Sequence, residues 1–328
     1  MKAMHSLKMK CNYGYSALRP AVFLMAVLMA AACSKEPAEV PEPGEAVRVN
    51  FVVSGIEQTT EATKAGEALA EGTTVRIAAY YHDPGNPQAS TLCKEVTYCV
   101  RDGKLVPCTV DGNGNFTAFG GQDMELLCYA YDFYAVSPAL PLSTDKRLVS
   151  QVPHGVDYAT SVTANQNIST SKVQTVSLTT LRRHCAKVTF VVKGEDGFTD
   201  LTALHVNTLT VGGLRPTCTN VGINSSVPAG VGSTSYVLPG EAFTASGATT
   251  SSASAFLLPT TGAGRITFDY GLTITVQGNS LTDTINGSIE ALQLDAGKSY
   301  TVTLTVKRNS SGLWVADWEI NSMSTSIG

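Results

Sequence analysis

The sequence predicts an all-β protein built from two tandem antiparallel β-sandwich domains. Apolar and polar side chains alternate with a period of two, Gly, Asn and Ser turns separate these runs, and no long amphipathic helix pattern interrupts them. Charged residues make up only 15% of the chain and hydrophobic residues 43%, and Thr, Ser and Val are abundant, which is more typical of pleated sheets than of surface helices. With 328 residues the chain is too long for one sandwich, so we expect two.

The clearest alternating run extends from Arg265 to Val276, with Ile, Phe, Tyr, Leu and Val on one face and mainly Thr and Asp on the other. Comparable runs predict further strands at 46–55, 74–82, 186–193, 281–290, 300–307 and 313–320. The stretch 137–171 carries few strand signals, so we expect it to end the first domain. The predicted limits are therefore 46–172 for the N-terminal sandwich and 173–328 for the C-terminal sandwich.

Residues 1–32 have the composition of a secretory signal. They contain four basic residues and no acid, and their apolar run at 21–32 is shorter than the about 20 residues that span a bilayer. Three alanines directly before Cys33 resemble a bacterial lipobox, which implies that Cys33 is lipidated; the alternative is a plain secretory peptide with an incidental cysteine. Residues 33–45 are expected to form an extended tether. The exported chain keeps 19 Lys and Arg against 27 Asp and Glu, a net charge of −8, which argues against nucleic-acid binding.

We expect no enzyme activity, no cofactor and no metal site. The chain lacks G-x-S-x-G, H-E-x-x-H, Walker and G-x-G-x-x-G motifs. His154 and Asp157 could act as a base and its orienting group, but no nucleophile accompanies them. Residues 111–115 resemble a calcium loop superficially, yet Phe116 stands where the sharp turn needs glycine, so a hairpin turn is expected.

The cysteines of the exported domains are expected to be mostly buried free thiols. They are Cys93, Cys99, Cys108, Cys128, Cys185 and Cys218, and no C-x-x-C pair is present, which argues against a structural zinc site. Cys99 and Cys108 flank a predicted turn at Asp102-Gly103. In that hairpin Cys99 would face Val106, which leaves Cys108 in a diagonal position too distant for an easy disulfide.

Four features of the sequence together resemble the fimbrillin (type V pilin) family of Bacteroidetes. They are the lipobox 30–33 with its acidic tether, the strand 46–55 with the loop 56–65 and the strand 74–82, the block 126–131 followed later by 184–190, and the ending 294–304 with Trp318 soon after. The resemblance implies two transthyretin-like sandwiches, a structural role in a fimbrium or in cell adhesion, and an outer-membrane lipoprotein at the cell surface.

The resemblance also implies assembly by proteolysis-triggered strand exchange. In this family a protease cuts after a basic residue behind the first strand, that strand leaves, and a strand of the next subunit fills the groove head to tail. Lys64 is the matching basic residue here, and the alternative is an ordinary solvated lysine; Arg48 is a poorer match because it lies within the strand. The exchanged strand would carry Val47, Val49, Phe51 and Val53 as its core. A C-terminal donor strand is only weakly indicated by Met323, Thr325 and Ile327, so stalk, tip and anchor roles all stay open.

The implied partners are other pilin subunits, a host or bacterial surface receptor, and the membrane through the lipid anchor. The alternative function is a glycan-binding surface lipoprotein. That function would need exposed aromatic rings, and Trp314 and Trp318 both fall at strand positions that are expected to face the core.

Overall fold

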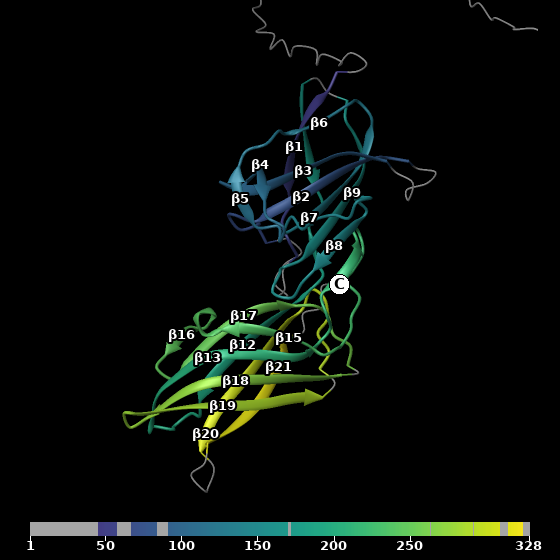
Figure 1. Cartoon of the computed structure of the whole chain (residues 1–328). Coiled ribbons are helices and arrows are strands. Elements are labelled where there is room, and N and C mark those ends of the chain that lie inside the picture. Colours follow the sequence, from purple (N-terminus) through teal and green to yellow (C-terminus); the bar gives the residue numbers. More distant parts are fainter. Residues whose placement is uncertain are drawn as a thin grey trace, which may run out of the picture. The chain divides into compact units, whose positions relative to one another are not determined.

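The protein is all-β, as the sequence predicts (Figure 1). A computed structural model describes residues 45–57, 67–83, 91–169, 172–262, 264–290, 292–308 and 314–323. The described helical structure is a single 3₁₀ turn, η2 (Gly240–Ala242), and no helix within these ranges is long and apolar enough to cross a membrane. The signal, Cys33, residues 33–44 of the tether, Lys64, Thr325 and Ile327 lie outside the described residues, so the predictions on them stay predictions.

The first half of the chain forms two sheets around one core. Its strands are β1 (Val47–Val53), β2 (Thr74–Tyr81), β3 (Leu92–Arg101), β4 (Lys104–Val110), β5 (Phe116–Phe119), β6 (Met124–Leu126), β7 (Ala130–Ser137), β8 (Leu148–Val152), β9 (Ala159–Asn167), β10 (Val173–Leu178) and β11 (Arg182–Arg183). A seven-stranded sheet has the order β11-β9-β7-β2-β3-β4-β5, and a three-stranded sheet has the order β10-β1-β6. Apolar side chains from both sheets, among them Val49, Phe51, Ile77 and Phe133, form the core between them.

The second half repeats this arrangement with longer strands. They are β12 (Ala186–Gly194), β13 (Leu201–Leu214), β14 (Cys218–Gly222), β15 (Thr234–Pro239), β16 (Thr244–Gly247), β17 (Thr250–Leu257), β18 (Arg265–Val276), β19 (Asn279–Glu290), β20 (Ser299–Arg308) and β21 (Trp314–Met323). The sheets have the orders β16-β17-β12-β20-β21 and β15-β13-β18-β19. Alternation along β18 buries Phe268, Tyr270 and Leu272 against Phe190 and Val302 of the other sheet. Most pairings are antiparallel, but β12 with β20 and β1 with β10 are parallel.

Strands on both sides of residue 172 share sheets. β10 pairs with β1, and β11 pairs with β9. β14, from the second half, pairs with β8, and a separate apolar cluster that includes Val149, Val152 and Val221 surrounds this two-stranded unit. The division at residue 172 therefore stays a prediction, and the hydrogen-bonded first sheets extend to Arg183.

The stretch 137–171 contains two strands although its sequence carries few strand signals. β8 and the nine-residue β9 both fall in this stretch, and β9 lies between β7 and β11. Its buried positions include Thr160, Ser161 and Thr163, so the strand lacks the apolar alternation that marks the others. Thr160 Oγ1 lies 2.7 Å from His184 Nε2, and Thr163 Oγ1 accepts the Thr179 N–H at 2.9 Å. These hydrogen bonds satisfy the hydroxyl groups of Thr160 and Thr163 inside the core, and a hydropathy pattern does not show them.

The expectation of mostly buried free thiols is confirmed for the six cysteines that the structure describes. Cys99, Cys108, Cys185 and Cys218 are buried, and Cys128 is exposed. Burial raises the pKa of the Cys185 thiol. Asp102 and Gly103 form the predicted turn with φ of 52° and 69°, and Cys99 pairs with Val106 as expected.

Stability is expected to fall when His184 becomes protonated in the unfolded chain. Burial, with a smaller contribution from Arg182, lowers the pKa of His184 from 6.5 to about 4. Between these values the unfolded chain binds a proton that the folded chain does not, so folding loses free energy as the pH falls from 6.5 towards 4. At 1.36 kcal/mol per pH unit the loss reaches about 3 kcal/mol.

Urea unfolding at pH 7 and pH 4.5 checks this expectation. Titration of the carboxylates changes the free energy of unfolding equally in closely related variants. The quantity to compare is therefore the loss of unfolding free energy between the two pH values in the wild type and in His184→Gln. His205→Gln, at an exposed position, is the control. We expect a loss smaller by about 2 kcal/mol in His184→Gln only. Equal losses in all three proteins would show that His184 is accessible to protons in the folded state.

Candidate functional site

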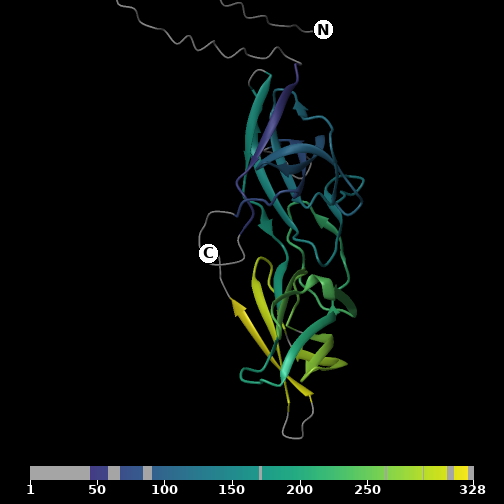
Figure 2. The ribbon, with the colours of Figure 1, turned by 90° about the vertical axis from the view of Figure 1, so that its left-hand side faces the viewer.

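β1 lies between β10 and β6 in the three-stranded sheet of the first half (Figure 2). We call the space that β1 occupies beside these strands and the core the β1 groove. On one side it pairs with β10 along its length, from Arg48 opposite Val173 to Val53 opposite Leu178. On its other side, β1 pairs with β6 over residues 47–49 only. The second half of β1 is therefore hydrogen-bonded as a strand along one edge, which makes it easier to remove than a strand paired on both sides.

Alternate side chains of β1 point into the core. Val47 and Val49 are fully buried, and Phe51 is 5% exposed. The Phe51 ring makes edge-to-face contacts with Tyr98 and Phe133, at centroid distances of 5.6 and 5.2 Å. The sequence pattern placed these residues and Val53 on one face, and the structure places the first three in the core.

Val53 lies at the margin of this core. It is half-buried and packs against the cluster rather than within it. A cavity of about 210 Å³ runs beside Phe51, Val53, Leu69 and Leu105, along the part of β1 that β6 does not reach. The role of all four side chains in an exchanged strand stays a proposal.

Glu57 and Glu67 are the described residues on either side of the segment that contains Lys64. The two ends are joined, because the Ile56 N–H donates to Glu67 O and the Glu67 N–H donates to Ile56 O, both at 2.8 Å. Between them, residues 58–66 form the covalent link from β1 to the rest of the sheet. A cut anywhere in this link would leave β1 attached by non-covalent contacts alone.

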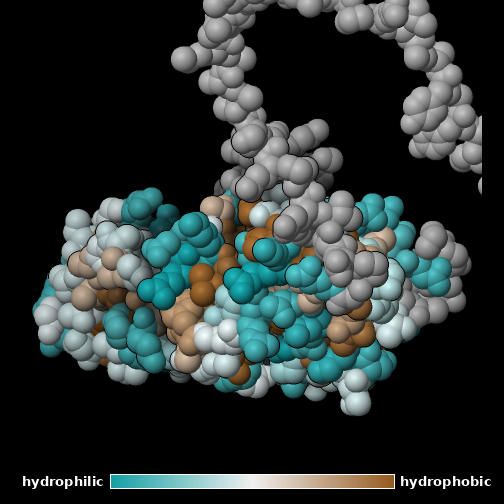
Figure 3. Space-filling model, turned by 90° about the horizontal axis from the view of Figure 1, so that it is seen from above, coloured by the Kyte–Doolittle hydropathy of each residue, from teal (hydrophilic) through white to brown (hydrophobic). Residues whose placement is uncertain are grey.

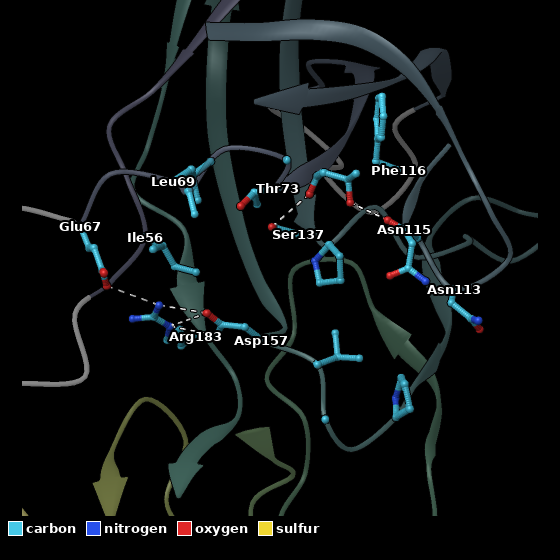
Figure 4. Close-up of a pocket in the computed structure, with 18 of the residues that line it drawn as sticks. Ile56, Glu67, Leu69, Thr73, Asn113, Asn115, Phe116, Ser137, Asp157 and Arg183 are labelled. Carbon is cyan, nitrogen blue, oxygen red and sulfur yellow. Dashed lines mark hydrogen bonds and ion pairs between the residues drawn. The ribbon is translucent and has the colours of Figure 1, made fainter. Parts of the chain in front are cut away.

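Arg183 occupies the end of the β1 groove (Figure 4). Its guanidinium binds Asp157 through Nε, at 2.9 and 3.1 Å from the two carboxylate oxygens, and through Nη2 at 2.9 Å. Nη1 donates to the main-chain carbonyl of Glu57, and Nη2 lies 3.7 Å from the Glu67 carboxylate. Since the Arg183 side chain is only 8% exposed, these contacts form a nearly buried ion-pair network that includes both ends of the 58–66 link.

The cavity next to this network has a volume of about 520 Å³ and lacks a catalytic arrangement among its described residues. It is lined by Ile56, Leu69, Phe116 and Pro138 on its apolar side, together with Asp157 and Arg183 (Figure 4). No group of three or more His, Cys, Asp or Glu side chains suited to a metal ion occurs in the described part of the chain.

His154 and Asp157 have separate structural roles. The His154 Nδ1 accepts the Leu258 N–H at 3.1 Å, and its Nε2 lies 3.0 Å from the carbonyl of Arg215, while Asp157 binds Arg183. Desolvation by burial lowers the pKa of His154. Residues 111–115, which resemble a calcium loop, form a hairpin turn between β4 and β5. In this turn the Asp111 carboxylate accepts hydrogen bonds from the main-chain N–H groups of Asn113 and Asn115, each at 2.8 Å.

The sequence profile of the fimbrillin-like family matches residues 46–327. The chain belongs to this family. A solved structure of a candidate cell adhesion protein from Bacteroides fragilis NCTC 9343 shares 22% identity with this fimbrillin-like chain, with a TM-score of 0.68 over 87% of this chain and 100% of the other. At this identity the likeness shows a shared fold.

Other solved structures are more distant from this fimbrillin-like chain. The fimbrial anchor protein Mfa2 from Porphyromonas gingivalis shares 14% identity, with a TM-score of 0.38 over 86% of this chain and 99% of that one. A fimbrial assembly protein from Parabacteroides distasonis ATCC 8503 shares 13% identity, with a TM-score of 0.45 over 85% and 99%. A comparison with curated proteins found no match.

Among the described residues of this fimbrillin-like protein, exposed aromatic rings occur at Tyr81, Phe116, Phe119 and Tyr129. The face in Figure 3 is mostly hydrophilic, with smaller hydrophobic areas between the polar ones. Tyr129 is 56% exposed and packs edge to face with Tyr81 at 5.5 Å between centroids. The side chains of Trp314 and Trp318 are outside the described structure, so the alternative of glycan binding through them stays untested.

The sequence alone does not predict the ion-pair network around Arg183. Its members come from four places in the chain, at residues 57, 67, 157 and 183, and no local pattern connects them. The two consecutive arginines at 182–183 indicate the network only weakly, because the sequence does not show that Arg183 is buried and Arg182 exposed.

Proposed function

We propose that this protein is a pilus subunit or fimbrillin-like adhesin of the cell surface that assembles by strand exchange after a cut at Lys64. The observation that carries the proposal is the position of β1: it fills the core of the first half, yet its covalent link to β2 passes through residues 58–66. Membership of the fimbrillin-like family and the fold shared with a candidate cell adhesion protein support a structural role without catalysis.

Loss of β1 would be costly enough to require a replacement. Burial of Val47, Val49 and Phe51 contributes roughly 1.5–3 kcal/mol each, or about 5–9 kcal/mol together. A typical domain is stable by only about 5–15 kcal/mol, and main-chain groups of β10 and β6 would also lose their partners. A strand from another subunit could restore both kinds of contact by β-augmentation.

The proposal extends to export and anchoring. The signal at 1–32, the lipidated Cys33 and the tether 33–45 would hold the protein at the outer membrane, and β1 follows the tether directly. The organisation into sandwiches 46–172 and 173–328 is part of the same proposal, and the subunit could occupy a stalk, tip or anchor position.

Mapping the N-terminus of surface-exposed protein tests the proposal. We expect assembled material to begin at Ala65, and Lys64→Gln to keep the Cys33 start and to lose the high-mass assemblies. Lys104→Gln, an exposed lysine within a strand, is the matched control and should be processed normally. Assemblies from Lys64→Gln equal to those of the wild type would contradict cleavage at this residue.

A further inference from the structure

Hydrogen-bond donors converge at the end of the β1 groove, beyond the apolar part of the strand. The Leu181 N–H donates to Gly55 O at 2.9 Å, and the Glu67 N–H donates to Ile56 O at 2.8 Å. Arg183 donates through Nη1 to Glu57 O and through its main-chain N–H to the Glu57 carboxylate at 3.3 Å. Removal of residues 55–57 would leave all four donors without these acceptors, around a mostly buried guanidinium.

The chain reaches these donors only because it bends at Gly55. Gly55 is buried and has φ of +127°, a backbone conformation that residues other than glycine rarely adopt. Just before the bend, Ser54 Oγ donates to Leu178 O at 3.1 Å. After it, Ile56 is buried and Glu57 lies against Arg183. Gly55 lies four residues after Phe51, and Glu57 lies six residues after it.

The rest of the β1 groove does not fix the register of an incoming strand. Main-chain ladders and apolar positions repeat every two residues, so a strand of alternating apolar residues could shift by two without losing the pattern. The contacts of Arg183 do not repeat. They would fix one register, because only one position of the incoming strand brings a bent end and its carbonyl to the guanidinium.

Charge decides which side chain suits the last position. Asp157 already forms a two-point contact with Arg183, and Glu67 lies 3.7 Å from it. Two carboxylates therefore already exceed the single positive charge of the guanidinium before any incoming residue arrives. A neutral hydrogen-bond acceptor satisfies the Arg183 main-chain N–H without adding a third negative charge.

We propose that Arg183 sets the register of the strand that fills the groove and selects its sequence. The partner strand, from another pilin subunit, carries alternating apolar residues, a glycine four positions after the residue that takes the place of Phe51, and an acceptor side chain two positions beyond this glycine. This inference rests on the proposed strand exchange. Arg183 acts as a positioning residue: it contacts the incoming main chain and takes no part in any covalent step.

Competition on the exported chain nicked after Lys64 tests the inference. The probe is a synthetic peptide of residues 46–57 with blocked ends, and the measurement is its apparent affinity in displacing the labelled resident strand. We expect a Gly55→Ala peptide to bind at least tenfold more weakly, and a Glu57→Gln peptide to bind within about threefold of the native one. In Arg183→Lys the native peptide should also lose at least tenfold, and the penalty of Gly55→Ala should shrink to less than about threefold.

Arg182→Lys is the matched control, because Arg182 is the exposed neighbour in the same short strand, and it should behave as the wild type. If Arg183→Lys does not fold, the Gly55→Ala peptide on the wild-type protein still decides the question. Equal binding of the native and Gly55→Ala peptides would overturn the role of Arg183 and leave strand exchange intact. No displacement by the native peptide would overturn both.

Discussion

Phe51→Ala is expected to destabilise the protein by about 3–5 kcal/mol, the largest effect that we expect from a substitution in β1. The ring is buried between Tyr98 and Phe133, so its removal leaves a cavity lined by aromatic rings that β-strands hold in place. The existing cavity beside Phe51 would enlarge. Urea unfolding of the uncut exported chain measures the change as a lower transition midpoint.

The adjacent Val52→Ala is the matched control, because Val52 lies in the same strand and is 54% exposed. Its free energy of unfolding should change by less than about 0.5 kcal/mol. Similar small effects from both substitutions would mean that β1 contributes little to the core, and the argument for a groove that needs refilling would fail.

Asp157→Ala should destabilise the protein by about 3 kcal/mol, because it leaves the nearly buried guanidinium of Arg183 without its two-point partner. Glu67 is too distant and too exposed to replace that contact fully. The loss should also loosen the end of β1, so hydrogen exchange at the Glu57 and Arg183 amides should accelerate more than exchange in β18.

A surface ion pair between β1 and Asp123 gives the contrast. Arg48 lies 3.5 Å from Asp123, and both side chains are substantially exposed. Asp123→Ala should therefore cost less than about 1 kcal/mol. A cost for Asp157→Ala as small as that for Asp123→Ala would show that the Arg183 network is not a structural anchor.

The sequence predicted those elements in which hydropathy alone determines the pattern. β1 and β18 each bury one face, and their alternating residues were identified correctly. β9 lacks such a pattern, because the buried hydroxyl groups of Thr160 and Thr163 depend on hydrogen bonds with His184 and Thr179, which lie on later segments.

A local sequence pattern also does not predict contacts between residues that are far apart in the chain. The parallel pairing of β1 with β10 joins residues more than 100 positions apart, and the network around Arg183 spans a similar separation. Gly55 illustrates the difference: its place at the end of a strand was visible in the sequence, but its use in directing Glu57 to Arg183 depends on the folded arrangement.

The most direct measurement of the central claim is the molar mass of the chain after β1 has been removed. Light scattering of the exported protein, cut after Lys64 and separated from its first strand, should show a mass that rises with protein concentration. Excess peptide 46–57 should return it to a monomer, because the peptide fills the groove. A protein that stays folded and monomeric at high concentration, and takes up no peptide, would contradict the claim that β1 is an exchangeable part of the fold.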